Sequence, residues 1–343
     1  MLLFKGTFIL IFFALLQLTQ VINCFGQDQS EVVAQKGEGI YSLLRKNGLD
    51  PSTYLKDFIE LNKEKLGAQH ILLEGQTYLL PQNTASVRKI AETAKPNIEI
   101  HPIFGKKFEK VEISSQELDG SIFYLMAGHG GYDPGAIGDY GPYQLSEDEY
   151  AYDVTLRLAR NLVSKGAEVH LIIQDENDGI RDDTILPMDK DEVALTKEKL
   201  PYSQKARLRQ RTQIVNDLYA KKRTQSTYHR LISIHLDSRN TGENTDVFFY
   251  HHHRSNSGEK LANRIHQTFA RKYQEHQPGR QYSGSVSSRS SLYVIRNTHP
   301  PIVFIELGNI QNSRDQRRFV MKNNRQAVAN WIAEGILADY RQQ

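Results

Sequence analysis

Two histidines in this sequence stand where apolar runs end, a context typical of ligand-binding residues in α/β proteins. His129 follows the apolar run of residues 122–127 and precedes two glycines, and His235 follows the apolar run of residues 231–234. Glycines beside a histidine let the backbone turn sharply and leave open space next to the imidazole. If both runs are parallel strands, the histidines share the carboxyl edge of a sheet, where open α/β sheets bind ligands. Either histidine alone is as well explained by a hydrogen-bonded turn or core residue.

Two glutamates extend this set. Glu306 follows the apolar run of residues 302–305 and is expected at the same edge. Ser146 and Glu149 have the spacing of a capping box at the start of a predicted helix. Glu149 is therefore expected to serve its own helix start, which leaves Glu147 free to point towards the sheet edge.

The chemistry available to these residues is that of a metal site without thiolates. Cys24 is the only cysteine, and it is expected to leave with a signal segment. Two histidines and one carboxylate with an open fourth position describe a catalytic zinc site. The same set can hold Fe(II) in an oxygenase, but nothing in an exported, cysteine-free chain supplies the co-substrates. The prediction is therefore Zn²⁺ on His129, Glu147 and His235, with Glu306 as the general base.

Four segments together resemble the zinc-dependent N-acetylmuramoyl-L-alanine amidase family, over about residues 105–341. The resemblance implies that His129, Glu147 and His235 are zinc ligands and that Glu306 is the catalytic glutamate. It implies hydrolysis of the peptidoglycan amide between N-acetylmuramic acid and L-alanine of the stem peptide. The segments are His129-Gly-Gly-Tyr-Asp-Pro-Gly-Ala136, Leu145-Ser-Glu147, Ile232-Ser-Ile-His235 and Val303-Phe-Ile-Glu-Leu-Gly308.

One further match and one departure from the family pattern add to this resemblance. Leu208-Arg-Gln-Arg211 matches a further family helix, whose polar residues are expected to brace the site. Asn309-Ile310 replaces the usual Phe-Leu after the catalytic glutamate. Two other functions stay open: a wall-binding protein that uses an amidase fold as a scaffold, and a related hydrolase that cuts within the stem peptide.

The elements that must position these residues predict an α/β domain over residues 105–343. Strand and helix patterns alternate, which favours an open, mixed and mostly parallel sheet with helices on both faces. The segment 174–205 breaks the pattern, and its length and charge predict a structureless connection that gates the groove. Strands are expected at 122–127, 168–173, 229–234, 246–250, 292–295 and 302–305, and helices at 147–165, 203–222, 257–276 and about 315–340.

A smaller unit with a β-α-α-β order is predicted for residues 31–82. Its strands are expected at 31–34 and 77–80, and its helices at 40–46 and 54–65. The positions Gly37, Asn62 and Gly75-Gln-Thr-Tyr-Leu-Leu-Pro81 resemble a LysM module. That resemblance implies binding to N-acetylglucosamine-containing glycans, and the alternative is a spacer without glycan affinity. Residues 83–104 are expected to be a linker.

Composition and the first residues bear on location. The chain of 343 residues carries 43 Lys and Arg against 40 Asp and Glu, a formal charge of +3 that argues against a dedicated nucleic-acid protein. A lysine and a short apolar run predict a signal peptide over residues 1–26 and no stable membrane span. A lipoprotein signal acylated at Cys24 is the alternative. The predicted protein is exported, periplasmic or wall-associated, with peptidoglycan as its partner.

Overall fold

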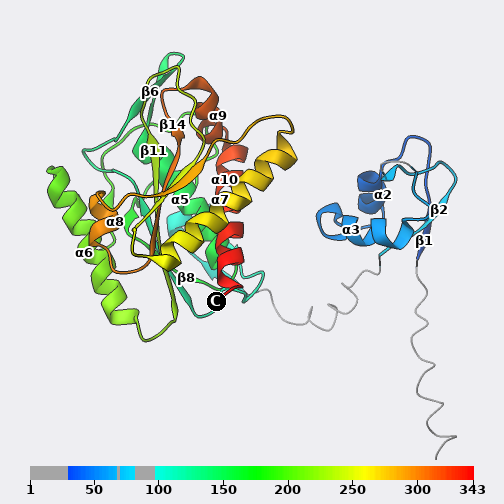
Figure 1. The fold of residues 1–343 in the computed structure, drawn as a ribbon, viewed down its shortest axis with the longest axis horizontal. Helices are drawn as coiled ribbons and strands as arrows, with labels where there is room; N and C mark the ends of the chain where they lie inside the picture. Colours follow the sequence, from blue (N-terminus) through cyan, green and yellow to red (C-terminus); the bar gives the residue numbers. More distant parts are fainter. Residues whose placement is uncertain (1–29, 68–69, 82–96) are drawn as a thin grey trace, which may run out of the picture. The chain divides into compact units, whose positions relative to one another are not determined.

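The computed structural model describes residues 30–67, 70–81 and 97–343. The chain divides between Lys95 and Pro96 into two compact units, which are coloured along the sequence in Figure 1. The predicted signal segment 1–26, with Cys24, and most of the predicted linker lie outside the described residues. Within the described part of the chain, no helix has both the length and the apolar character needed to cross a membrane.

The first unit has the predicted β-α-α-β order: β1 (Glu31–Val33), α2 (Ile40–Lys46), α3 (Pro51–Asn62) and β2 (Thr77–Leu79). The strands pair antiparallel, with Val32 opposite Tyr78. Asn62 closes the unit, because its side-chain amide donates to the carbonyl of Leu79 and its amide oxygen accepts from the Leu79 N–H, each at 2.8 Å. The helix α3 begins earlier than expected, at Pro51, whose fixed φ and missing N–H suit the first helical position.

The second unit is built on a six-stranded sheet with the order β13-β12-β14-β11-β5-β8. Neighbours are parallel except for β12 and β14, which pair antiparallel. This arrangement confirms the predicted mixed and mostly parallel sheet. The strands are β5 (Ser121–Ala127), β8 (Glu168–Leu171), β11 (Tyr228–Asp237), β12 (Phe248–His251), β13 (Ser285–Ser288) and β14 (Ile302–Asn309).

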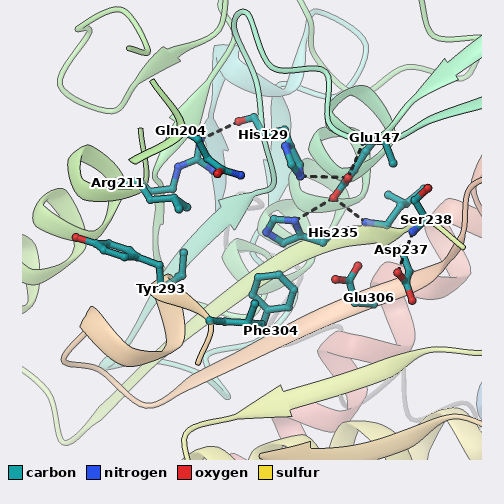
Figure 2. A pocket seen from close by; sticks show the side chains of 15 residues that line it. His129, Glu147, Gln204, Arg211, His235, Asp237, Ser238, Tyr293, Phe304 and Glu306 are labelled. Atoms are coloured by element: carbon teal, nitrogen blue, oxygen red, sulfur yellow. Dashed lines mark hydrogen bonds and ion pairs between the residues drawn. The ribbon is translucent and has the colours of Figure 1, made fainter. Parts of the chain in front are cut away.

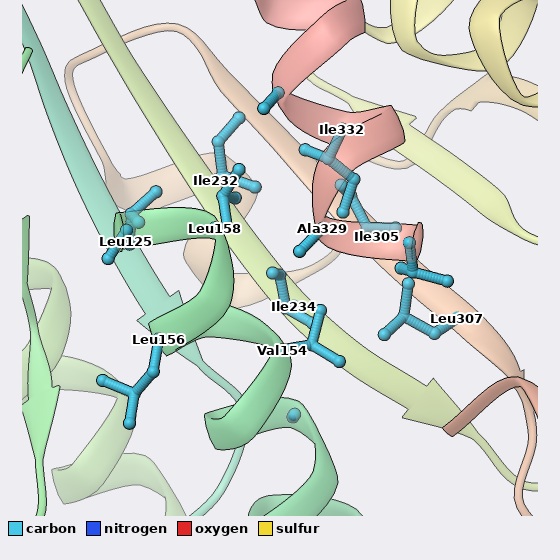
Figure 3. Close-up of a cluster of buried hydrophobic side chains, with 14 of the residues drawn as sticks. Leu125, Val154, Leu156, Leu158, Ile232, Ile234, Ile305, Leu307, Ala329 and Ile332 are labelled. Carbon is cyan, nitrogen blue, oxygen red and sulfur yellow. The ribbon is translucent and has the colours of Figure 1, made fainter. Parts of the chain in front are cut away.

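Helices cover both faces of this sheet, as predicted. On one face, Leu125 and Ile232 pack into an apolar cluster with Val154 of α5 and Ile332 of α10, which Figure 3 shows. On the other face, Tyr124 packs with residues of α6 and α8. The central strand β5 is therefore buried along its whole length, which explains its continuous apolar run. The helices are α5 (Glu147–Val163), α6 (Gln204–Lys222), α7 (Asn256–His276), α8 (Tyr293–Asn297), α9 (Ser313–Val320) and α10 (Lys322–Tyr340).

The strand predicted at residues 292–295 is wrong, because this segment begins the helix α8. Val294 and Ile295 are buried against the sheet from this short helix. The side chain of Thr298 donates to the carbonyl of Val294 at 2.8 Å, and that of Asn297 donates to the carbonyl of Tyr293 at 2.7 Å. Packing and these end contacts override the strand preference of a β-branched pair.

The predicted linker boundary at residue 104 is also wrong. The strand β3 (Ile98–Ile100) pairs antiparallel with β4 (Lys110–Glu112), and the 3₁₀-helix η2 (Pro102–Phe104) follows β3. Phe104 is buried in the main core, and its carbonyl accepts from the N–H of Ile180 at 3.0 Å. The second unit therefore includes residues before 105.

The segment 174–205 is packed structure and not the structureless connection that its length suggested. The short strands β9 (Ile173–Gln174) and β10 (Val193–Ala194) pair antiparallel. The Tyr150 hydroxyl donates to the carbonyl of Thr184 at 2.8 Å, and the buried Arg325 donates to the carbonyls of Arg181 and Asp183. A lid that opens here would have to break these contacts.

Candidate metal centre

The three strands that end in candidate residues are neighbours in the sheet and run parallel. The register places His235 of β11 directly opposite Glu306 of β14, and His129 follows the end of β5 by two residues. All three side chains therefore lie at one carboxyl edge, as predicted. Together with Glu147 they line a pocket of about 380 Å³, shown in Figure 2.

Glu147 lies between the two histidines and brings them into one cluster. Its Oε2 is 3.1 Å from Nε2 of His129, and its Oε1 is 3.0 Å from Nδ1 of His235. One donor atom from each of the three side chains lies within 4.8 Å of the others. The two imidazole rings are 5.4 Å apart at 78°. The geometry thus offers two nitrogen donors and one oxygen donor to a single ion.

Two glycines are required by this cluster. A Cβ at Gly128 would lie 2.4 Å from Nδ1 of His235. A Cβ at Gly135 would lie 2.6 Å from Oε2 of Glu147 and 2.8 Å from Cδ2 of His129, and Gly135 also has a φ of +71°. His129 itself has a φ of 55°, which is uncommon outside glycine. The Gly-rich loop therefore lets the backbone approach the side chains that form the cluster.

Glu147 is positioned by the backbone that surrounds it. Its N–H donates to the carbonyl of Ala136 at 2.9 Å, and the N–H of Ala136 donates back to its Oε2 at 3.0 Å. The N–H of Leu236 donates to its Oε1 at 3.1 Å. Burial opposes ionisation, but hydrogen bonds from His129 and His235 hold the pKa of Glu147 well below its usual value. The carboxylate is therefore held ionised and in a fixed orientation.

The capping box expected at the start of α5 is absent. Ser146 is the N-cap residue, but its side chain makes no capping hydrogen bond. Glu149 instead pairs with Arg181 at 2.9 Å and accepts from the N–H of Asp189 at 3.1 Å. Glu147 does point towards the sheet edge as predicted, but contacts with Ala136 place it there.

A second layer of residues braces the His129 loop. Nδ1 of His129 is 3.0 Å from Oδ2 of Asp133, which also accepts from Nη2 of Arg207 at 2.6 Å. Arg211 donates to the carbonyls of His129 at 2.9 Å and Ala127 at 3.3 Å, which agrees with the bracing role expected of its helix. Such outer contacts fix the orientation of metal-binding histidines. Asp133 lies within the segment His129–Ala136, but the sequence pattern did not indicate that it would orient His129.

Glu306 faces the same pocket from β14, and one of its oxygens has no partner. Its Oε2 is buried and forms no hydrogen bond with any described residue. Burial raises the pKa of Glu306 well above its usual value, and the carboxylates of Glu147 and Asp237 raise it further. An unpaired buried carboxylate oxygen is costly for folding, so its position indicates a role in the pocket.

Phe304 is a further site residue that the sequence reasoning missed. Its ring stacks on the imidazole of His235, with centroids 4.1 Å apart and planes at 16°. It lies two residues before Glu306 on the same strand, so the period-2 alternation of strands would have placed both on one face.

The residues present fit a divalent metal ion. The two nitrogens and one oxygen suit zinc and other borderline cations, and the open side of the cluster carries the unpaired oxygen of Glu306. The surroundings also favour positive charge at this point. Burial alone would lower the pKa of His129, but hydrogen bonds with Asp133 and Glu147 raise it to about 10; a bound metal ion would displace the proton that these carboxylates stabilise.

One protein family matches most of the second unit, and several solved structures resemble the chain. The family model for N-acetylmuramoyl-L-alanine amidase matches residues 124–338. The CwlD amidase from Clostridioides difficile, solved in complex with the GerS lipoprotein, is 21% identical at a TM-score of 0.49, and the match covers 65% of this chain and 100% of that chain. Ami1 from Mycobacterium smegmatis is 18% identical at a TM-score of 0.48, with 66% and 99% covered. AmiC2 from Nostoc punctiforme is 21% identical at a TM-score of 0.45, with 66% and 99% covered. No curated protein matches the chain.

Proposed function

Because the chain belongs to the N-acetylmuramoyl-L-alanine amidase family, we propose that His129, Glu147 and His235 hold a catalytic zinc ion and that Glu306 is the general base. The chain is a peptidoglycan hydrolase that cleaves the amide bond between N-acetylmuramic acid and L-alanine of the stem peptide.

The two buried glutamates of the pocket differ in how their oxygens are hydrogen-bonded, and this difference is the main support for the proposal. Both carboxylate oxygens of Glu147 contact a histidine, and each also accepts a hydrogen bond from a backbone N–H group, that of Ala136 or Leu236. Glu306 lies across the pocket and keeps a buried oxygen without a partner among the described residues. One carboxylate therefore has the contacts of a ligand, and the other has the free oxygen that a proton acceptor needs.

A zinc ion bound by these three residues would supply a Lewis acid for the substrate carbonyl and a water of lowered pKa. Glu306 accepts the proton of the attacking water and returns it to the leaving amine of L-alanine. The raised pKa of Glu306 favours its protonated form after the first transfer, which suits the second transfer. Phe304 holds the ring of His235 by stacking, and Arg211 holds the His129 backbone.

The first unit is proposed to bind the wall. Its β-α-α-β order and the position of Asn62 support a LysM-like module that binds glycans. An amidase that acts on peptidoglycan works outside the cytoplasmic membrane. We therefore propose export by the segment 1–26 to a periplasmic or wall-associated location, with acylation at Cys24 as the alternative route.

The test is a digest of purified peptidoglycan, with fragments identified by mass spectrometry and zinc measured in the same preparation. The expected products are stem peptides with a free L-alanine amine and glycan strands with free lactyl groups. Fragments cut within the stem peptide would instead identify a peptidase. Binding without any cleavage would identify a scaffold protein.

A further inference from the structure

Two exposed tyrosines form a stacked pair beside the candidate metal centre. Tyr132 is the third residue after His129, and Tyr202 comes from the end of the segment 174–205; their ring centroids are 4.2 Å apart at 28°. Tyr132 is 50% exposed and Tyr202 is 75% exposed, the highest value among the exposed large hydrophobic residues of the described chain. Ordered aromatic rings that are left uncovered contribute little to the core, so they point to a binding surface.

The pair is tied to the catalytic loop through one arginine. Arg207 donates through Nη1 to the carbonyls of Tyr202 at 2.5 Å and Pro201 at 3.0 Å. Through Nη2 it donates to Asp133, which is in turn hydrogen-bonded to His129. The position of Tyr202 is therefore coupled to the loop that carries a candidate ligand.

Other residues of the segment 174–205 contact the backbone next to Tyr132. The buried Glu192 accepts from the N–H of Gly131 at 2.7 Å. The side chain of Leu200 packs so closely against Gly130 and Gly131 that a Cβ at either glycine would lie 3.2 Å from it. The surface is thus pre-organised, which lowers the entropic cost of binding.

We propose that the Tyr132–Tyr202 pair is a subsite for a sugar ring of the glycan strand, next to the muramic acid whose amide is cut. The proposal rests on the amidase function. Gln204, two residues after Tyr202, lines the metal pocket, so the pair borders the reaction site. A pyranose ring has an apolar C–H face that fits a flat aromatic surface, and its hydroxyls lie around the edge.

Polar groups at the edge of the pair match those hydroxyls. Each ring of the stack carries a hydroxyl, and the interaction with Tyr132 raises the pKa of the Tyr202 hydroxyl. The ammonium of Lys190 is 5.9 Å from the centroid of Tyr132 and adds a donor. Asp133 and Arg207 form an ion pair, so each of these two charges near the tyrosines already has a partner. A flat aromatic face with hydroxyl and ammonium groups beside it fits a sugar ring.

The test compares kcat/KM of the full chain on two soluble substrates with the same peptide, one with a single muramic acid and one with a four-sugar glycan. Tyr202→Ala should lower kcat/KM on the four-sugar substrate about tenfold, the worth of one good aromatic contact, and leave the single-sugar rate nearly unchanged. Tyr202→Phe keeps the ring and should keep most of the preference. Tyr143→Ala removes another exposed tyrosine, 54% exposed, and should keep it fully.

Three results would overturn the subsite. Equal losses on both substrates would mean that the tyrosines only support the His129 loop. No loss on either would mean that the pair binds nothing, and a loss that follows peptide length would assign it to the stem peptide.

A binding measurement separates this proposal from the amidase chemistry. Titration calorimetry with a peptide-free four-sugar glycan should show about tenfold weaker binding by Tyr202→Ala than by the wild type, whether or not the wild type cleaves its substrate. The wild type and Tyr202→Ala share the same first unit, so glycan binding by that unit contributes equally to both titrations. Identical affinities would contradict the subsite, whereas a wild type that cleaves no amide would contradict only the proposed chemistry.

Discussion

Replacing Gly135 by alanine places a methyl group between two of the three proposed ligands. The new Cβ would lie 2.6 Å from Oε2 of Glu147 and 2.8 Å from Cδ2 of His129. Ordinary Cβ contacts begin near 3.4 Å, so the carboxylate or the ring must move by roughly 0.6–0.8 Å. Metal sites hold their ligand distances within about 0.2 Å, and a shift of about 1 Å in a reacting group can cost about 100-fold in rate. We therefore expect Gly135→Ala to lose zinc affinity and at least about 100-fold in amidase rate.

Backbone strain has to be separated from this clash. Gly135 has a φ of +71°, and alanine in that conformation costs about 1–2 kcal/mol. Gly141 has a φ of +59° with nothing within 4 Å of its Cβ position, so Gly141→Ala carries the strain alone. Gly141→Ala should melt about 2–8 °C below the wild type, and Gly135→Ala should lose at least as much because the clash adds to the strain.

The assay measures melting temperature, zinc affinity by competition with a chelator, and amidase rate for both variants. Only Gly135→Ala should lose zinc and activity. Wild-type zinc affinity in Gly135→Ala would refute the placement of the site, and equal losses in both variants would refute the clash as the cause.

Two further predictions concern the segment 174–205 and the first unit. Burial raises the pKa of Glu192 to about 8 from the usual 4.5, so between these pH values the unfolded chain releases a proton that the folded chain keeps, and stability falls as pH rises. Glu192→Gln cannot titrate, so it should not lose stability in this way as pH rises. The melting temperature of the variant minus that of the wild type should therefore be larger at pH 8 than at pH 5. The same difference in melting temperature at both pH values would contradict the argument that burial raises the pKa of Glu192. Deleting residues 31–82 should weaken co-sedimentation with insoluble wall and leave the second unit folded, whereas unchanged co-sedimentation would make the first unit a spacer.

The sequence was sufficient for the sheet edge and its residues. Apolar runs that end in His129, His235 and Glu306 predicted three parallel strands with a common carboxyl edge, and the register confirms that edge. The prediction succeeded because buried parallel strands have a strong apolar pattern, and because parallel strands bring their ends together wherever they stand in the sequence.

The capping box could not be settled from spacing. Ser146 and Glu149 have the right spacing, but Glu149 gains an ion pair with Arg181, more than thirty residues away in the sequence. Local spacing cannot reveal such a competing partner. The helix α8 was missed for a similar reason, because burial of Val294 and Ile295 against the sheet outweighs their local preference.

The packing of the segment 174–205 was hidden by its composition. Its charged residues suggested exposure, but backbone carbonyls of the segment accept hydrogen bonds from Tyr150 and Arg325 in distant helices. Backbone groups carry no sequence signal, so these contacts appear only in three dimensions. The pairing of Tyr202 with Tyr132 belongs to the same class.

The most direct test of the account is zinc content measured together with amidase rate in Glu306→Gln and Glu147→Gln. Glutamine keeps the size of each side chain and removes its proton acceptor. Glu306→Gln should keep about one zinc per chain and lose roughly 10²–10⁴-fold in rate, the usual contribution of a positioned general base. Glu147→Gln should lose zinc, because its carboxylate is a proposed ligand beside both histidines. An empty Glu306→Gln beside a fully loaded Glu147→Gln would reverse the two roles, and full activity in both would contradict the proposed mechanism.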